Sequence, residues 1–455
     1  MCALANGSVA LQNQPEKCGF FLAPSTLAGG IGRGVFAGRN YTKDEKIDTM
    51  ITVTIPFDIL WDGEWSLRNY VFAHDEDSES MAVFGVAMLF NHRHAEKVLH
   101  YWDEHEIAKT SDSSYTPSSV MSHVVFETAL PVQTGEELYC NYGGSGWFQS
   151  RGLTLVDETL TSGAPEREKQ VPSSFLHEYG FCLDHVEFKP STKPIAGTGL
   201  FAKKAFKKGE IVTISPVLAL PAPEIELFTV ESVIQNYCIS APGSQVAILP
   251  IGYGAGINHD ANASLVMDWY DGWKSTSVAE NLGSEFLRKS LELDTGAILS
   301  VDYSPLDLKY TATRDIAAGE ELTVNYGEVW VEAWAEYLAK SLEHNSRRTL
   351  STWEGTGRTG TSAGSRSNTS DGHGKNIGDP PLFRKFMQAP AGLFPEQWNL
   401  PDPRRPLLYA EEYLEGEGEE AGKWVKEVPG RPREDLHVPV PTETEKVQPS
   451  YLNEL

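Results

Sequence analysis

Short apolar runs, broken by glycine and proline, dominate the first three quarters of the chain. β-Branched and aromatic residues fill these runs and turn residues bound them, which is the pattern of short β-strands. The predicted strands lie at 35–37, 47–55, 124–126, 211–220 and 246–251. Apolar residues spaced three and four apart predict fewer helices, at 224–236, 281–293 and 329–342. The pattern therefore predicts an α+β, β-rich fold.

Several motifs occur twice in the same order. Gly34-Val35-Phe36-Ala37 returns as Gly199-Leu200-Phe201-Ala202. With one common spacing, Asn69-Tyr70, Gly85, Asn91-His92 and Trp102 return as Asn236-Tyr237, Gly252, Asn258-His259 and Trp269. Finally, Gly135-Glu136-Glu137-Leu138 with Asn141-Tyr142-Gly143 returns as Gly319-Glu320-Glu321-Leu322 with Asn325-Tyr326-Gly327. So many elements in one order indicate a tandem duplication.

The duplication divides the chain into four segments. The first repeat covers residues 18–150, a polar linker covers 151–170, and the second repeat covers 171–343. From 344 onward a low-complexity, Gly- and Ser-rich stretch is typical of a flexible linker, and the tail up to residue 455 is predicted to be partly disordered. Apolar clusters such as Leu393-Phe394 leave open whether the tail docks on the second repeat or stays extended.

Charge and composition exclude several classes of protein. The chain has 38 Lys and Arg against 63 Asp and Glu, a formal net charge of −25, which disfavours direct nucleic-acid binding and favours a basic partner. No segment approaches the ~20 apolar residues of a membrane helix, and no secretory signal is visible. We therefore expect an intracellular protein of the nucleus or cytoplasm that binds no membrane.

The cysteines carry a separate prediction. Cys2, Cys18, Cys140, Cys182 and Cys238 are scattered and form no C-x-x-C pair. A disulfide framework or a zinc site needs closely spaced ligands. The sequence therefore predicts five reduced thiols and no metal site.

Three of the repeated motifs carry groups suited to chemistry. Glycines allow backbone amides to approach a ligand closely, although turn glycines are far more common. An Asn-His pair can bind a nucleoside-like ligand or satisfy buried backbone. The tyrosine of each last motif can orient an amine, whereas the two glutamates before it are consistent with a solvated turn.

Taken in this order, the motifs resemble the SET domain of protein lysine methyltransferases, over about residues 18–148 and again over 171–338. The resemblance implies two tandem SET-like (β-clip) domains, S-adenosyl-L-methionine as the cofactor, and transfer of a methyl group to a lysine of a protein substrate. By the same resemblance, the channel tyrosines are Tyr142 and Tyr326, with Tyr70 and Tyr237 as further candidates. The implied cofactor contacts are Gly32, Gly34, Asn91, His92, Tyr142, Gly197, Gly199, Asn258, His259 and Tyr326.

The chain departs from the family pattern in two ways. Neither repeat completes the N-H-S-C-x-P-N motif, and no cysteine-rich zinc segment follows either repeat. Aromatic residues, namely Trp147-Phe148 and Trp330 with Trp334, are candidates to close the channel instead. The second repeat keeps Arg314-Asp315-Ile316 before its Gly-Glu-Glu-Leu, so we expect it to be the catalyst. The alternative is a SET-fold binding or scaffold protein without turnover.

Overall fold

The computed structural model describes much of both repeats and a short part of the tail. The described residues are 18–27, 32–47, 51–56, 66–73, 79–93, 98–102, 124–143, 147–148, 170–193, 196–222, 225, 234–273, 284–301, 304, 306–339 and 385–399. The predicted linker lies outside them except for Gln170. Most of the predicted helix at 224–236 and most of the tail also lie outside the described residues.

Short strands joined by turns build the first repeat. The strands are β1 (Phe20–Pro24), β2 (Arg33–Ala37), β3 (Lys46–Ile47), β4 (Ile51–Pro56), β5 (Val71–Ala73), β6 (Glu79–Phe84), β7 (Asn91–His92), β8 (Val98–Trp102), β9 (Val124–Thr128) and β10 (Glu137–Cys140). The 3-10 helices are η2 (Ser66–Asn69) and η3 (Val86–Leu89). The predicted strands at 35–37 and 124–126 are confirmed. The described residues of the predicted run at 47–55 belong to β3 and β4, and residues 48–50 lie outside the described part of the chain.

The second repeat shows the same order of elements after an opening helix α4 (Ser173–Tyr179) and strand β11 (Phe181–Cys182). The order is β12 (Val186–Pro190), β13 (Thr198–Ala202), β14 (Ile211–Pro221), η5 (Ile234–Tyr237), β15 (Ile239–Ser240), β16 (Val246–Pro250), η6 (Tyr253–Gly256), β17 (Asn258–His259), β18 (Leu265–Trp269), β19 (Leu306–Ala312) and β20 (Thr323–Val324). Thus β12 and β13 correspond to β1 and β2, β14 to β3 and β4, and η6 to η3.

The predicted helices at 281–293 and 329–342 are confirmed, whereas the described end of the predicted helix at 224–236 forms the 3-10 helix η5. Between β18 and β19 lie α6 (Ser284–Leu291) and α7 (Thr295–Leu299), where the sequence predicts a helix at 281–293. Residues 328–339 form a further helix, in agreement with the prediction at 329–342. The fold is therefore β-rich with few helices, as predicted.

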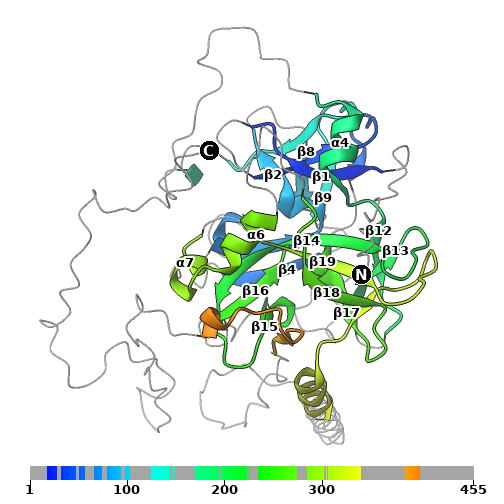
Figure 1. The fold of residues 1–455 in the computed structure, drawn as a ribbon. Coiled ribbons are helices and arrows are strands. Elements are labelled where there is room, and N and C mark those ends of the chain that lie inside the picture. The colour runs from blue at the N-terminus through cyan, green and yellow to red at the C-terminus, as the bar shows by residue number, and fades with distance from the viewer. Residues whose placement is uncertain are drawn as a thin grey trace, which may run out of the picture.

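The sheets mix strands from different parts of the chain. The first sheet has the order β11-β1-β2-β10-β7, so a strand of the second repeat extends a sheet of the first. The largest sheet has the order β18-β19-β14-β16-β15-β21, in which β21 (Met387–Gln388) belongs to the tail. Figure 1 draws β1, β2, β8 and β9 in the upper part and β14, β16, β18 and β19 in the lower part, with β4 among the lower strands.

One hydrophobic core continues from the first repeat into the second. It includes Phe84 and Phe126 of the first repeat and Leu249 and Tyr310 of the second, all buried. A side-chain contact joins them directly, since the rings of Phe84 and Tyr237 stack with centroids 5.1 Å apart. The two repeats therefore share an interior.

The prediction of five reduced thiols is wrong for one pair, because Cys18 and Cys182 form a disulfide with Cα atoms 5.9 Å apart. Antiparallel pairing of β1 with β11, with Phe21 opposite Cys182, brings them together. They stand 164 positions apart in the sequence, so no spacing rule connects them. Stable disulfides are rare in reducing compartments, so the bond weighs against the predicted intracellular location, which stays a prediction.

Part of the tail docks on the second repeat. Residues 385–399, here called the C-terminal segment, place β21 parallel to β15, with Ile239 opposite Met387. Trp398 is fully buried, and the Trp269 indole donates to the Leu393 carbonyl at 2.7 Å. In Figure 1 the segment, drawn in orange, lies beside β15. For these residues the question left open by the sequence is answered.

Candidate functional site

The Asn-His motif and the tyrosine motif lie side by side in each repeat. β17 pairs parallel with β20, with Asn258 opposite Thr323, and β7 pairs parallel with β10 in the matching register. The His259 Nδ1 accepts the Tyr326 backbone N–H at 3.0 Å. This register brings Asn258, His259 and Tyr326 together although they are far apart in the sequence.

The same hydrogen bonds are found in the first repeat. The His92 Nδ1 accepts the Tyr142 backbone N–H at 3.0 Å. The Tyr142 hydroxyl donates to the Phe90 carbonyl at 2.6 Å, just as the Tyr326 hydroxyl donates to the Ile257 carbonyl at 2.6 Å. The predicted site residues are therefore assembled in both repeats in the same way.

In each repeat, the second glutamate of the Gly-Glu-Glu-Leu motif is buried beneath the glycine turn, although the sequence suggested a solvated turn. Glu137 and Glu321 are 3% and 8% exposed. The side-chain nitrogen of Asn258 donates to the Glu321 carboxylate and to the Thr198 carbonyl, both at 3.0 Å. A Cβ added to Gly199 would collide with that carboxylate, and one added to Gly34 would collide with Glu137. The second glycine of each motif is thus needed for close approach.

The remaining bonds to these carboxylates come from residues that sequence reasoning missed. Glu321 accepts from the Ser191 hydroxyl at 2.6 Å and the Thr192 backbone at 2.7 Å, and Glu137 accepts from Ser25 and Thr26 in the same way. Burial raises the pKa of Glu321, but the hydrogen bonds from Ser191, Thr192 and Asn258 outweigh it, so this pKa lies below its ordinary value. The sequence did hold a sign of these residues, because a Ser-Thr pair precedes each Gly-x-Gly motif at nearly the same distance.

The first glutamate of each pair does lie in a turn, as the sequence suggested. Glu136 accepts the Gln133 backbone N–H, and Glu320 accepts that of Ala317 at 2.9 Å. The two glutamates of each Gly-Glu-Glu-Leu motif therefore have different roles.

In each repeat, the two predicted channel tyrosines lie near one another. Burial raises the pKa of Tyr326, and the neighbouring Tyr237 raises it further. Burial also raises the pKa of Tyr237, to about 12. In the first repeat, burial raises the pKa of Tyr142, with a smaller contribution from Tyr70. Each predicted pair of channel tyrosines is thus close enough to interact.

Aromatic rings cover the tyrosine and histidine of each repeat. Trp330 lies 4.8 Å from Tyr326 and 5.5 Å from His259 between ring centroids, and Trp334 stacks on Trp330. In the first repeat, Trp147 lies 4.8 Å from Tyr142, and Phe148 lies 4.8 Å from His92. The aromatics that the sequence suggested as channel closers therefore lie against the predicted tyrosine and histidine of each repeat, and their role in closing a channel stays a prediction.

The glycine turns differ between the repeats. In the first repeat, Arg33 of the Gly32-Arg33-Gly34 turn forms an ion pair with Asp307 of the second repeat, and both side chains are at least nine-tenths buried. The Tyr70 hydroxyl accepts the Ser304 backbone N–H at 3.1 Å. These contacts bind the first-repeat site to the second repeat.

The second-repeat turn has a charged pair nearby, whereas open space at the first glycine is common to both turns. A Cβ added to Gly197 (φ +64°) would meet no atom within 4 Å, and the same holds for Gly32 (φ +85°). Lys193 pairs with Asp260, the residue after His259, and both side chains are about one-third exposed. Burial lowers the pKa of His259, so its imidazole is neutral at pH 7.

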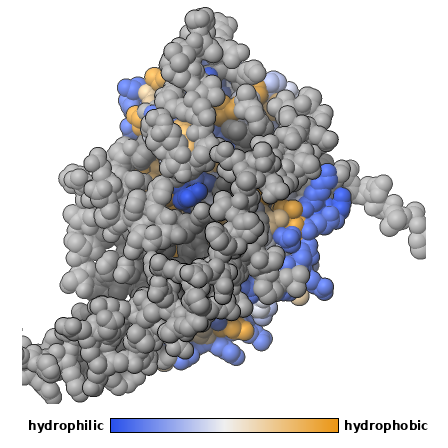
Figure 2. All heavy atoms as spheres, turned by 90° about the vertical axis from the view of Figure 1, so that its left-hand side faces the viewer, coloured by the Kyte–Doolittle hydropathy of each residue, from blue (hydrophilic) through white to orange (hydrophobic). Residues whose placement is uncertain are grey.

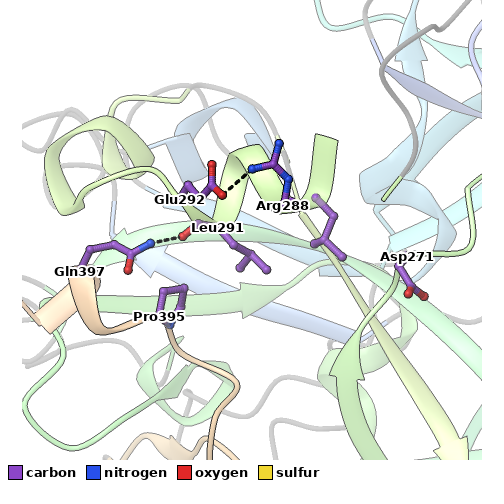
Figure 3. A pocket seen from close by; sticks show the side chains of 7 residues that line it. Asp271, Arg288, Leu291, Glu292, Pro395 and Gln397 are labelled. Atoms are coloured by element: carbon purple, nitrogen blue, oxygen red, sulfur yellow. Dashed lines mark hydrogen bonds and ion pairs between the residues drawn. The ribbon is translucent and has the colours of Figure 1, made fainter. Parts of the chain in front are cut away.

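A surface pocket of about 410 Å³ lies elsewhere, between α6 and the C-terminal segment. Figure 3 shows Arg288 turned toward Glu292, and the Gln397 amide donating to the Leu291 carbonyl across the pocket edge. None of the predicted site residues lines it. The described residues on the face drawn in Figure 2 are mostly hydrophilic, with small hydrophobic groups between them.

Two further searches cover the described residues only. Within them, no helix is long and apolar enough to cross a membrane. No group of three or more His, Cys, Asp or Glu side chains is placed there to hold a metal ion.

Comparison with known proteins identifies a domain in the second repeat. Residues 197–327 match the family model of the SET domain, which is typical of lysine methyltransferases. The match begins at the Gly-Thr-Gly turn and ends at the glycine after Tyr326. It does not extend to the first repeat, so it does not show a tandem arrangement. No curated protein matches the chain.

Several solved structures are similar to parts of the chain. A Plasmodium falciparum protein described as a candidate histone methyltransferase is 20% identical, with a TM-score of 0.22, over 32% of this chain and 96% of that one. Polycomb repressive complex 2 of Chaetomium thermophilum bound to GSK126 is 20% identical, with a TM-score of 0.22, over 31% of this chain. The match covers 16% of that polycomb chain.

Proposed function

We propose that the chain is an S-adenosylmethionine-dependent protein-lysine N-methyltransferase whose active site lies in the second repeat. The observation that carries the proposal is the SET-domain match over residues 197–327. The geometry supports it, because the Gly197-Thr198-Gly199 turn, Asn258-His259 and Tyr326 meet at one place. We also propose that the first repeat, with its matching elements and registers, is a second SET-like domain.

The residues around Gly197 fit S-adenosylmethionine. The open space at Gly197 leaves the backbone accessible. Because the side-chain nitrogen of Asn258 is bonded within the fold, its Oδ1 is left to accept an N–H from a ligand. Lys193 and Asp260 offer both signs of charge to a zwitterionic amino-acid end. These residues would hold the cofactor.

The protein's contribution to the reaction is positioning. Bound S-adenosylmethionine supplies an activated sulfonium methyl group. Burial keeps Tyr326 protonated, so its hydroxyl and the Ile257 carbonyl present a fixed polar edge to an amine. Trp330 and Trp334 exclude water beside it, and desolvation favours the neutral amine of the acceptor lysine. Holding an amine in line with an activated methyl provides much of the acceleration.

The partner is proposed to be a protein with an accessible lysine and a basic surface. The net charge of −25 attracts cationic proteins to the surface. The first repeat is proposed to serve as a structural partner, because its Arg33 and Tyr70 are bound to the second repeat.

The exchange of Tyr326 for Phe tests the assignment. Tyr326→Phe removes the hydroxyl bonded to Ile257, and we expect at least about a tenfold loss of methyl transfer, since about 1.4 kcal/mol of transition-state stabilisation is tenfold in rate. The matched variant Tyr142→Phe, which removes the corresponding first-repeat hydroxyl, is expected to change the rate by less than about threefold. The measurement is transfer of labelled methyl to core histones.

Two results would contradict the proposal. If Tyr142→Phe alone abolished transfer, the active site would lie in the first repeat. If calorimetry detected no binding of S-adenosylmethionine to the intact chain, the chain would be a SET-fold binding protein without turnover.

A further inference from the structure

Tyr310 carries a buried hydroxyl without a hydrogen-bond partner. The residue lies in β19 and is 1% exposed. Within the described part of the chain, its hydroxyl oxygen makes no hydrogen bond. A buried hydroxyl that loses its bonds to water without replacement destabilises a fold, so such a group in a native protein calls for an explanation.

The first repeat shows that the fold does not need this hydroxyl. Tyr310 stands opposite Met267 in the β18–β19 pair, and Phe126 stands opposite His100 in the corresponding β8–β9 pair. Because Trp269 and Trp102 occupy the same position in the two pairs, Phe126 is the counterpart of Tyr310. A phenylalanine fills that place in a fully buried core.

A second difference makes room for the hydroxyl. Gly254 lies two residues after Gly252, just as Ala87 lies two residues after Gly85, and each of these leading glycines precedes a 3-10 helix. A Cβ added to Gly254 would lie 2.5 Å from the Tyr310 hydroxyl oxygen and also 2.5 Å from the Ser215 Oγ. The second repeat therefore has a tyrosine with a glycine where the first has a phenylalanine with an alanine.

The hydroxyl lies at the proposed site. Tyr326 is close enough to Tyr310 to raise its pKa. Gly254 belongs to the turn that leads into Ile257, since the Ile257 N–H donates to the Gly254 carbonyl at 3.4 Å. The Ile257 carbonyl in turn holds the Tyr326 hydroxyl. Tyr310, Gly254 and Tyr326 thus meet at one turn.

We propose that Tyr310 is a further acceptor-site residue of the second repeat, whose hydroxyl pairs with an N–H or O–H group that enters with the acceptor lysine. The inference rests on the proposed function. The entering group is the acceptor amine or a water molecule that accompanies it, and a protonated phenol can pair with either. This assignment explains why a hydroxyl is kept where phenylalanine would pack.

Tyr310→Phe in the full chain separates this role from a structural one. We expect kcat for methyl transfer from labelled S-adenosylmethionine to core histones to fall about tenfold, which corresponds to about 1.4 kcal/mol. The urea midpoint of unfolding should stay equal or rise, because an unpaired buried hydroxyl is removed. An unchanged kcat would overturn the inference. So would a joint loss of stability and rate, because the hydroxyl would then support the fold.

The double variant Tyr310→Phe/Gly254→Ala recreates the first-repeat pair. We expect it to be at least as stable as Gly254→Ala alone, because Tyr310→Phe removes one of the two close contacts of the added Cβ, the other being with the Ser215 Oγ, while kcat stays low. Recovery of the wild-type kcat would show that only packing matters and would overturn the inference.

Tyr41→Phe is the matched control. It removes a buried hydroxyl that donates to the Gly19 carbonyl at 2.8 Å, within the first repeat. It should lower the urea midpoint and leave kcat unchanged; a comparable loss of kcat would make the Tyr310 effect non-specific and overturn the inference. If the wild-type chain itself binds no S-adenosylmethionine or transfers no methyl, the proposed function fails and this inference fails with it.

Discussion

At the scale of single residues, the buried carboxylate of Glu321 connects three separate stretches of the chain. It accepts hydrogen bonds from Ser191, Thr192 and Asn258, and it lies under Gly199. Removing a charge from water is costly unless hydrogen bonds replace those lost. Here several donors do so, and the same donors hold the glycine turn against the Asn-His strand. The carboxylate therefore fixes the site's geometry without being exposed at it.

Glu321→Gln is predicted to destabilise the fold by about 1.5–3 kcal/mol at pH 7, the usual value of hydrogen bonds to a charged group. The folded-state pKa of Glu321 is lowered relative to an unfolded value of about 4.3. Its stabilisation is therefore complete above the unfolded pKa and is lost as pH falls through the folded pKa. Urea unfolding from pH 7 down to pH 3 should show a smaller acid-dependent loss in the variant than in wild type.

Glu320→Gln is the matched control for that prediction. Glu320 is the preceding residue, and it pairs with Arg314 at 2.5 Å at a partly exposed turn. An exposed ion pair contributes about 0–1 kcal/mol, so this variant should cost much less than Glu321→Gln. Equal costs for both variants would contradict the special role of the buried carboxylate.

The sequence predicted only part of this site. Asn258, His259 and Tyr326 were found because they recur in fixed order, and the structure brings them together. Glu321 was read as solvated because a Glu-Glu pair in a turn gives no sign of which member is buried. The Cys18–Cys182 disulfide was missed because the pairing of β1 with β11 joins distant parts of the chain.

At the scale of elements, the C-terminal segment completes the largest sheet. The Gln388 N–H donates to the Tyr326 carbonyl at 2.9 Å, and the Met387 N–H donates to the Cys238 carbonyl at 2.9 Å. The segment therefore contacts two residues near the candidate site: Cys238, which follows Tyr237, and Tyr326 itself. β21 is only two residues long, too short for a period-two pattern, which is why the sequence predicted no strand there. Strands such as β9, whose side chains alternate between buried and half-buried, are the kind that hydrophobic pattern reveals.

Trp398→Ala is predicted to detach this segment. The indole is fully buried, donates to the Leu293 carbonyl at 3.1 Å and packs against Trp269. Loss of a buried aromatic side chain costs about 3–5 kcal/mol, so limited proteolysis should cut the variant within 385–399 where wild type resists. Leu130→Ala, which removes a side chain that is 53% exposed, is the control and should leave the cleavage pattern unchanged. Equal resistance of Trp398→Ala and wild type would show that the segment is held by other contacts.

At the scale of the whole molecule, three kinds of contact join the repeats. The Cys18–Cys182 disulfide is covalent, the core is continuous, and Arg33 pairs with Asp307. The sequence predicted two repeats, and this tandem arrangement stays a prediction. The sequence did not predict that the repeats pack together, because Arg33 occupies the variable position of a glycine turn and its partner Asp307 lies in the other repeat. The repeats are thus separate in sequence but joined in packing.

The interface between the repeats is therefore predicted to be sensitive to the loss of either partner of the Arg33–Asp307 pair. Both side chains are at least nine-tenths buried, the Trp273 indole donates to Asp307 at 2.9 Å, and Arg33 donates to the Ser304 carbonyl at 2.8 Å. Removing one partner leaves a buried charge uncompensated, so Asp307→Ala should lower the free energy of unfolding by about 3–5 kcal/mol. Urea denaturation measures the change.

A double variant tests whether the stability lost in Asp307→Ala comes from the charge left unpaired on Arg33. Arg33→Met combined with Asp307→Leu removes both charges and keeps apolar volume, and replacing a buried pair in this way is often neutral, so much of the stability lost in Asp307→Ala should return. Asp315→Ala breaks the exposed pair between Lys207 and Asp315, whose side chains are 76% and 62% exposed, and should cost much less than Asp307→Ala because solvent screens such a pair. If Asp307→Ala cost no more than Asp315→Ala, the buried ion pair would not hold the repeats together, and the disulfide and the shared core would have to do so alone.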